Sequence, residues 1–233
     1  MKAPLWTYSI MKAEKSIKSN IEAISATLPQ GVTLIAVSKY HPADAIMQAY
    51  DAGQRDFGES KAQDLRTKQQ ELPDDIRWHF IGHLQSNKIK YIAPFIHLIH
   101  SIDSLKLLKE VDRHGAKCGR KIPCLLQIHI AREETKFGFT PGECMEMLSG
   151  GEWRTLHHIE LRGLMCMASN TDDMESVAGE FRTVKELFDR VKEEFFAGNE
   201  EFSIFSAGMS DDYPTAIENG STHIRIGSGI FNV

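Results

Sequence analysis

Two cationic residues near opposite ends of the sequence have the chemical character of a shared site. Lys39 follows the apolar run Val32–Ser38, and Arg225 lies inside the β-rich segment His223–Ile226. A cation within or at the end of a buried strand costs much desolvation free energy unless it has a partner. Each residue therefore marks a candidate site. If the first and last strands are neighbours, the two sites are one.

Strand alternation refines the role of Lys39. Thr33, Ile35, Val37 and Lys39 share one face of the predicted strand, so we expect the lysine amine to face the interior. Burial beside other cations leaves more of a lysine as the neutral amine, which attacks aldehydes to form a Schiff base. This segment alone leaves equally open a lysine that extends from the strand end into solvent.

Two turns rich in small residues near the C-terminus are candidate anion sites. Ser206–Asp212 follows one predicted strand and leads into a short helix over Tyr213–Asn219, and Gly227–Gly229 follows the last strand. Free backbone N–H groups at such places bind phosphate, although most serine and glycine clusters are simple turns. Two such turns beside an interior lysine favour a phosphorylated aldehyde, and pyridoxal 5'-phosphate (PLP) fits that description.

Arg225 has a plausible place beneath the pyridine nitrogen of PLP. A guanidinium carries only hydrogen-bond donors and stays protonated, so it would keep that nitrogen unprotonated. An unprotonated pyridine is a poorer electron sink, which favours holding the cofactor or modest carbanion chemistry over transamination. The alternative is a structural ion pair between Arg225 and an inward carboxylate.

The elements that must position these residues alternate between strand and helix. The pattern predicts helices over Tyr8–Thr27, Ala43–Ala52, Leu105–His114 and Met174–Phe196. It predicts eight strands, over Val32–Ser38, Gln54–Gly58, Arg77–Ile81, Ile96–Ser101, Pro123–Ile130, Leu161–Ala168, Phe202–Ser206 and His223–Ile226. We expect an α/β protein that forms a (β/α)8 TIM-type barrel, with residues 1–233 as a single domain. A doubly wound open sheet is the competitor, and it would separate Lys39 from Arg225.

Composition excludes several classes of protein. The 233 residues are 42% hydrophobic and carry a formal charge of -5 with a pI near 6.1, which argues against nucleic acid and anionic membranes as partners. No apolar stretch reaches the roughly 18 to 20 residues that a membrane span needs. The four cysteines show no CxxC spacing, and no signal peptide is evident, so we expect a cytoplasmic protein. The spacing of His79 and His83 does not predict a metal site.

Several short motifs are spread over nearly the whole sequence. They are Ala36-Val37-Ser38-Lys39, Phe57-Gly58-Glu59, Trp78-His79-Phe80-Ile81-Gly82, Leu84-Gln85-Ser86-Asn87-Lys88, Lys136-Phe137-Gly138, Arg162-Gly163-Leu164-Met165, Gly208-Met209-Ser210, Arg225-Ile226-Gly227-Ser228 and Ile230-Phe231. Through these motifs the sequence resembles a known family, the pyridoxal phosphate homeostasis proteins of the YggS or PROSC type. Ser60, His83 and Ala207 differ from the usual residues of the family. Ser60 also lacks the amide that an asparagine would offer to a cofactor.

The resemblance implies a PLP fold type III barrel, akin to the N-terminal domain of alanine racemase without the second β domain. It implies Lys39 as the lysine that forms the Schiff base, Arg225 facing the pyridine nitrogen, and Ser210, Gly227 and Ser228 around the phosphate. The full set of predicted cofactor-binding residues is Lys39, Met165, Ser206, Met209, Ser210, Arg225, Gly227 and Ser228. No catalytic residue is predicted.

Three functions follow from these residues. The leading one is a carrier or buffer that binds PLP, shields its aldehyde and hands it to apo PLP-dependent enzymes, with no established catalytic turnover. A racemase would need a second acid–base group from another domain, and we expect none because the sequence stops at Val233. A lysine-dependent aldolase would give Arg225 no task. We expect a monomer, with a weak dimer as the alternative.

Overall fold

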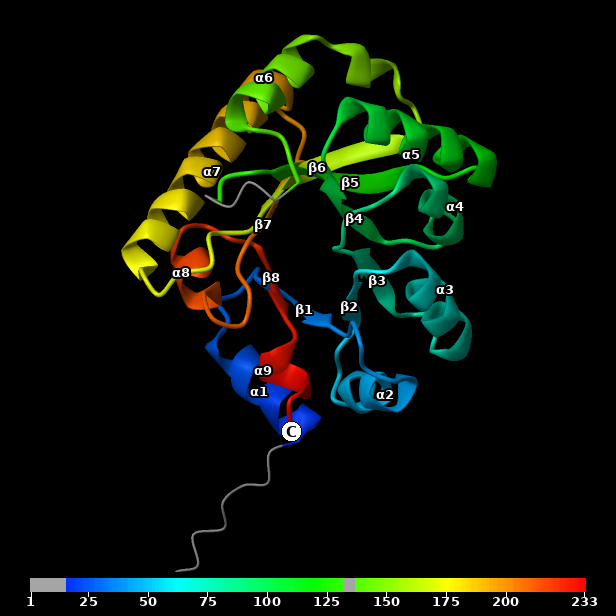
Figure 1. Ribbon diagram of the computed structural model, residues 1–233, viewed down its shortest axis with the longest axis vertical. Helices are drawn as coiled ribbons and strands as arrows, with labels where there is room; N and C mark the ends of the chain where they lie inside the picture. The colour runs from blue at the N-terminus through cyan, green and yellow to red at the C-terminus, as the bar shows by residue number, and fades with distance from the viewer. Residues whose placement is uncertain (1–15, 132–136) are drawn as a thin grey trace, which may run out of the picture.

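The computed structural model describes residues 16–131 and 137–233. Eight parallel strands close into a barrel in the order β1-β2-β3-β4-β5-β6-β7-β8, and the helices lie outside it (Figure 1). The last strand pairs directly with the first, with Ile35 opposite Arg225. The predicted (β/α)8 barrel is therefore confirmed, and the open sheet is excluded. The predicted start of the first helix and the motif residue Lys136 lie outside the described residues.

The eight strands all fall where the sequence predicts them, with ends that differ by one or two residues in most cases. Their bounds are β1 Thr33–Val37, β2 Asp56–Glu59, β3 Arg77–Phe80, β4 Leu98–Ile102, β5 Ile122–Ile128, β6 Ile159–Cys166, β7 Ile204–Ser206 and β8 His223–Ile226. One end matters for the site. Because β1 ends at Val37, one residue before the predicted end at Ser38, Lys39 lies in a turn to which the strand alternation does not extend.

The helices cover the outer face of the barrel. Their bounds are α1 Ile17–Thr27, α2 Ala43–Asp51, α3 Ala62–Glu71, α4 Ile89–Ile92, α5 Leu105–Cys118, α6 Pro141–Ser149, α7 Met174–Phe195, α8 Tyr213–Glu218 and α9 Ser228–Phe231, with short 3-10 turns η1 Ser86–Lys88 and η2 Glu152–Thr155. In α7 the buried residues recur every three or four positions, which seats one apolar face on the sheet. Its start is capped by Asp173, which accepts a hydrogen bond from the Ser176 amide.

The two faces of the sheet differ in character. Strand residues that face the helices, such as Leu34, Ala36 and Phe57, belong to the large apolar core. The interior holds a small apolar cluster of Leu98, Leu125 and Met165. Polar side chains from other strands share that interior, as the contacts described below show. This polar filling is unusual for a barrel interior, which branched apolar residues commonly fill.

Both ends of the described chain meet on one side of the barrel. Helix α9 lies beside α1 (Figure 1), and Asn20 Nδ2 donates a hydrogen bond to the Ile230 carbonyl at 3.0 Å. This contact holds the turn after β8 in place, because Ile230 is only three residues beyond Gly227. None of the helices among the described residues is long and apolar enough to cross a bilayer.

Candidate cofactor-binding site

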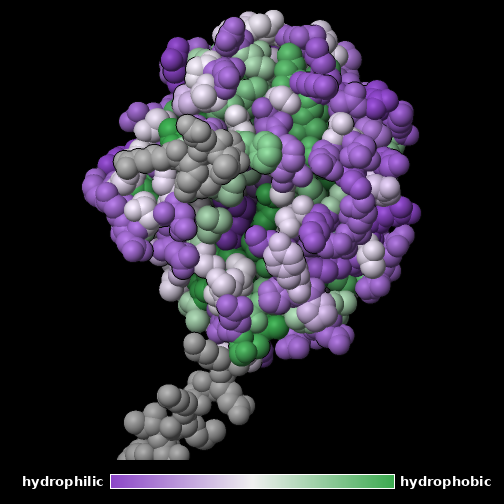
Figure 2. All heavy atoms as spheres, in the orientation of Figure 1, coloured by the Kyte–Doolittle hydropathy of each residue, from purple (hydrophilic) through white to green (hydrophobic). Residues whose placement is uncertain are grey.

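The eight predicted site residues come together at one end of the barrel. They lie on or just after β1, β6, β7 and β8, and these strands are consecutive around the closed sheet. The turn after β8 packs against the end of β1, since a Cβ atom built on Gly227 would lie 3.3 Å from the Val37 carbonyl oxygen. Residues nearly two hundred positions apart therefore share one mouth. The face drawn in Figure 2 is hollowed near its centre, and hydrophilic residues lie in that hollow.

Lys39 is more open than the sequence suggests. The residue is exposed, and its Nζ lies 6.0 Å from the ring centroid of Tyr40, a residue held at φ 70° and itself 78% exposed. The predicted burial of the lysine is therefore wrong. The physical reason is that pairing between β1 and β2 ends at Val37 opposite Gly58, so the strand alternation does not continue to Lys39.

The turn that carries Lys39 is nevertheless firmly anchored. Glu59 Oε1 accepts hydrogen bonds of 2.6 Å from both Ser38 Oγ and Lys68 Nζ, and Lys68 also donates to the Ser38 carbonyl at 2.9 Å. Ser38 and Glu59 are buried, so these charge-assisted bonds are shielded from water. The residue next to Lys39 is thus fixed while Lys39 itself stays accessible.

Arg225 is buried in the barrel interior with only 4% of its surface exposed. Its Nη1 donates to Ser206 Oγ at 2.7 Å and its Nη2 to the Cys166 carbonyl at 2.9 Å. Among residues 16–131 and 137–233, no carboxylate forms an ion pair with this guanidinium, so the alternative of a structural ion pair is not supported there. Burial lowers the pKa of Arg225 from its ordinary value, and nearby Cys166 and Asp212 offset only part of this effect.

The two small-residue turns face each other. Ser228 Oγ donates a hydrogen bond to Ser210 Oγ at 3.0 Å, and the amides of Ser228 and Gly229 find no acceptor among the described residues. A Cβ built on Gly229 would lie 3.0 Å from Ile226 Cγ2 and 4.0 Å from Ser210 Oγ, so a larger residue would crowd this turn. Hydroxyl and amide donors this close in sequence and space are a donor set that can bind phosphate.

Gly208 shapes the first of these turns. Its φ is 94°, and a Cβ atom there would come within 2.7 Å of the Ala216 side chain and 2.9 Å of the Tyr213 Cα. Only glycine fits this conformation and this packing. The turn is completed by Asp212, whose carboxylate accepts a hydrogen bond from the Met209 amide at 2.5 Å. Met209 itself is 40% exposed, so its side chain is available at the mouth.

The remaining predicted residues lie deeper. Met165 is 1% exposed and packs with Leu98 and Leu125 in the interior cluster. Ser206 is fully buried, and its hydroxyl contacts both Arg225 Nη1 and His100 Nδ1. Direct contact of either residue with a cofactor stays a prediction. The observed hydrogen bond indicates that Ser206 positions the guanidinium of Arg225.

Sequence reasoning missed three polar residues that share this interior, Asp56, His79 and His100. All are buried, and each lies on a different strand, β2, β3 and β4. A usable signal was present, because a polar residue in a buried strand raises the same question that singled out Arg225. Asp56, His79 and His97 also have potential ligand atoms within 4.8 Å of one another. Arg77 binds both Asp56 carboxylate oxygens and His79 binds one of them, so we assign this group to hydrogen bonding.

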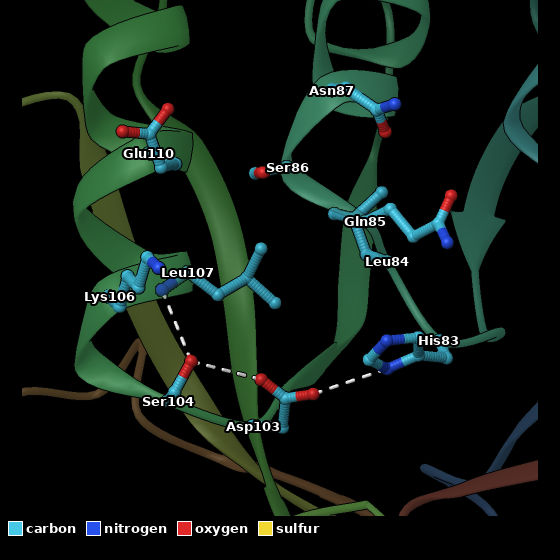
Figure 3. Close-up of a pocket in the computed structure, with 10 residues that line it drawn as sticks. All are labelled: His83, Leu84, Gln85, Ser86, Asn87, Asp103, Ser104, Lys106, Leu107 and Glu110. Carbon is cyan, nitrogen blue, oxygen red and sulfur yellow. Dashed lines mark hydrogen bonds and ion pairs between the residues drawn. The ribbon is translucent and has the colours of Figure 1, made fainter.

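A separate hollow of about 480 Å³ lies between η1 and the first turn of α5 (Figure 3). His83 points toward Asp103 there, with 3.2 Å between His83 Nδ1 and the carboxylate, and Asp103 accepts a hydrogen bond from Ser104. His83 also stacks on Phe137, with ring centroids 3.8 Å apart. None of the predicted cofactor-binding residues lines this hollow, so it is distinct from the candidate site.

The fold and the site together define a barrel protein with a candidate ligand site at the carboxyl ends of strands β1, β7 and β8. Residues 13–233 match the family model of the alanine racemase N-terminal domain. The chain is 41% identical over 202 residues to the pyridoxal phosphate homeostasis protein of Helicobacter pylori strain 26695, covering 86% of this chain and 87% of that protein. It is 34% identical over 224 residues to the homologue of the same name from Schizosaccharomyces pombe, covering 93% and 92%. The chain therefore belongs to the pyridoxal phosphate homeostasis protein family.

Solved structures agree with this assignment. PipY of Synechococcus elongatus PCC7942 with PLP bound has a TM-score of 0.85 and 34% identity, covering 93% of this chain and 100% of PipY. The alanine racemase of Clostridium difficile 630 has a TM-score of 0.69 at 16% identity and covers 92% of this chain, which spans 56% of that structure. The racemase likeness shows a shared fold and no more.

Proposed function

We propose that this protein binds PLP at the carboxyl end of its barrel, holds it through Lys39 and releases it to other proteins, so that it acts in cofactor homeostasis. The observation that carries the proposal is Arg225, a buried cation without a carboxylate partner among the described residues, set beneath a mouth lined by free donors. A buried guanidinium with unused N–H groups suits an uncharged ring nitrogen as its acceptor. Residues 1–233 would form one such domain.

The residues present fit PLP group by group. Ser210, Ser228, Gly227 and the neighbouring amides would hold the phosphate, and Arg225 would face the ring nitrogen. Met165 and Met209 would contact the ring, and Ser206 would position Arg225. When bound, PLP supplies an electrophilic aldehyde. Lys39 would supply the amine that condenses with this aldehyde, with loss of water.

The exposure of Lys39 supports a carrier more than an enzyme. A lysine at an open turn is reachable by water and by other amines, which favours exchange of the bound aldehyde. The relatives at 34–41% identity carry the name of a homeostasis protein. The racemase alternative is supported by the match to one racemase domain and by a fold likeness at 16% identity, which shows the fold alone.

Absorbance titration tests the proposal directly. PLP added to the purified protein should produce the yellow absorbance of covalently bound aldehyde, and Lys39→Ala should abolish it. Lys61→Ala is the matched control, because Lys61 Nζ lies at a similar distance, 5.5 Å, from the same Tyr40 ring. Absence of a spectral change in the native protein, or an equal loss in both variants, would contradict the proposal. Incubation with L-alanine followed by chiral analysis tests the racemase alternative.

The handing over of cofactor is a separate part of the proposal. Apo PLP-dependent enzymes are the proposed recipients, and the protein is proposed to act as a monomer in the cytoplasm, where unpaired cysteines such as its four are usual. Activation of an apo-enzyme by the PLP-loaded protein should be faster than by the PLP that spontaneously dissociates from it. Equal rates would reduce the role to storage. Sedimentation equilibrium at micromolar concentration should give a mass near 26.3 kDa.

A further inference from the structure

A line of hydrogen-bonded side chains runs through the barrel interior from its amino end to Arg225. His79 Nε2 lies 3.0 Å from Asp56 Oδ1, and His79 Nδ1 lies 2.9 Å from His100 Nε2. His100 Nδ1 lies 3.0 Å from Ser206 Oγ, which accepts the hydrogen bond from Arg225 Nη1 at 2.7 Å. We call Asp56, His79, His100 and Ser206 the interior relay.

The interior relay is shielded from solvent and connects distant strands. His79 is 1% exposed, and His100 and Ser206 are fully buried. The contact between His100 on β4 and Ser206 on β7 crosses the barrel, because these strands are not neighbours in the sheet. Hydrogen bonds in such a low-dielectric interior are stronger than in water and polarise one another along a network.

Chemistry sets the direction of each hydrogen bond from the Asp56 end. Burial alone would raise the pKa of Asp56, but hydrogen bonds from Arg77 and His79 outweigh it and hold that pKa well below its usual value. The carboxylate is then charged and only accepts, so His79 donates from Nε2. With His79 neutral, its Nδ1 accepts from His100 Nε2, and His100 Nδ1 accepts from the Ser206 hydroxyl.

If the hydrogen bonds ran in the opposite direction, the hydroxyl proton of Ser206 would have no acceptor among the described residues. If His79 were doubly protonated, His100 would accept at Nε2 and donate from Nδ1 to Ser206. Ser206 would then accept from both His100 and Arg225, and its own hydroxyl proton would have no acceptor among the described residues. Burial also lowers the pKa of His100 well below its ordinary value, which keeps that ring neutral. The first direction satisfies every donor and acceptor of the line.

We propose that Asp56, His79 and His100 are positioning residues for the cofactor, acting through Ser206 to orient the guanidinium of Arg225 toward the pyridine nitrogen. The Ser206 hydroxyl donates a hydrogen bond to His100 Nδ1 and accepts one from Arg225 Nη1. The distant Asp56 carboxylate polarises this acceptor, in addition to the attraction that Asp212 exerts on Arg225 without a direct ion pair. The inference rests on the proposed function, because it gives the ring nitrogen as the target of Arg225.

A ligand pair isolates this role. The probes are PLP and its carbocyclic analogue, in which a CH group replaces the ring nitrogen. The native protein should bind PLP about tenfold more tightly than the analogue, since only PLP accepts a hydrogen bond from Arg225. In Asp56→Asn, which preserves the size of the side chain and removes its charge, the preference should fall to less than about threefold.

Two variants calibrate the result. His97→Gln is the matched control, because the His97 ring lies near the His79 ring, with centroids 5.2 Å apart, yet forms no hydrogen bond with the interior relay. It should keep the full preference for PLP. Ser206→Thr, which retains a hydroxyl, should keep more of the preference than Ser206→Ala. Thermal denaturation of each variant without PLP checks that it folds.

The outcomes separate the two proposals. If the native protein binds neither ligand, the proposed function fails, and the inference fails with it. If the native protein prefers PLP and Asp56→Asn keeps that preference, or loses affinity for both ligands equally, only the inference is overturned. Should Asp56→Asn not fold, ¹H–¹⁵N correlation spectra of the native protein decide. Neutral Nε2–H tautomers for both His79 and His100 support the interior relay, and any other protonation state of either ring overturns it.

Discussion

The polar groups at the two ends of the barrel differ in burial and in hydrogen bonding. At the amino end, Asp56 is bound by Arg77 and His79, and its oxygens have partners. At the carboxyl end, Lys39 is exposed and the amides of Ser228 and Gly229 find no acceptor among the described residues. Buried polar groups whose hydrogen bonds are all made can only support their neighbours. Donors without an acceptor at the open end of the barrel can bind a ligand. Arg225 lies where the two arrangements meet.

We expect the largest effect on PLP binding from replacing Arg225. Arg225→Met should weaken PLP binding about 100-fold, because a hydrogen bond to a charged donor in a buried site is lost. The PLP-free protein should be no less stable, since a buried cation without a direct ion pair among the described residues is replaced by an apolar side chain of similar length. Equilibrium dialysis and urea denaturation measure the two quantities. Equal losses of binding and stability would show that Arg225 is structural, as the amino-end residues are.

The anchor of the Lys39 turn should respond differently. Glu59→Gln removes the charge that holds Ser38 and Lys68, so we expect a loss of about 2 kcal/mol in the free energy of unfolding. PLP affinity should fall only a few-fold, because no group that contacts the cofactor is removed. Urea denaturation with a parallel PLP titration checks both numbers. Glu71→Gln, a change at the exposed end of α3, is the control and should leave stability within about 0.5 kcal/mol.

The phosphate side of the mouth offers a smaller effect with an internal control. Ser228→Ala and Ser210→Ala should each weaken PLP binding about tenfold, the value of one hydrogen bond to a charged group. Pyridoxal, which lacks the phosphate, should bind the native protein and both variants equally. If both variants lost the same affinity for pyridoxal, the phosphate would bind elsewhere. The contrast between an open carboxyl end and a filled interior would then be lost.

These contrasts explain which features the sequence could reveal. The eight strands were predictable because apolar runs alternate with amphipathic segments, and Arg225 was predictable because a cation in such a run needs an explanation. The burial of Lys39 was predicted wrongly because strand length depends on pairing with a neighbour, and the β1–β2 pairing stops at Val37. His100 and Ser206 meet across the barrel, 106 positions apart in sequence. No local pattern encodes which interior residues lie opposite one another.

The smallest predicted effect is on the pH dependence of the free energy of unfolding. It tests a histidine in the barrel interior and not the open carboxyl end. Burial lowers the pKa of His223 to about 4. The unfolded chain therefore binds more protons than the folded protein between about pH 4 and 6.5, so stability is lost as the pH falls through this window. From pH 7 to 5.5 this single group should cost about 1 kcal/mol of unfolding free energy. His223→Gln should remove that part of the pH dependence, measured by urea denaturation at the two pH values.

His157→Gln serves as the control for this titration, because His157 is exposed and lies outside the barrel interior. It should leave the difference between the two pH values unchanged. If His223→Gln also left the difference unchanged, His223 would be protonated in the folded protein, and the interior would tolerate a second cation besides Arg225. That result would weaken the contrast on which the site is argued, since an interior that accepts spare cations gives Arg225 no special need for a ligand.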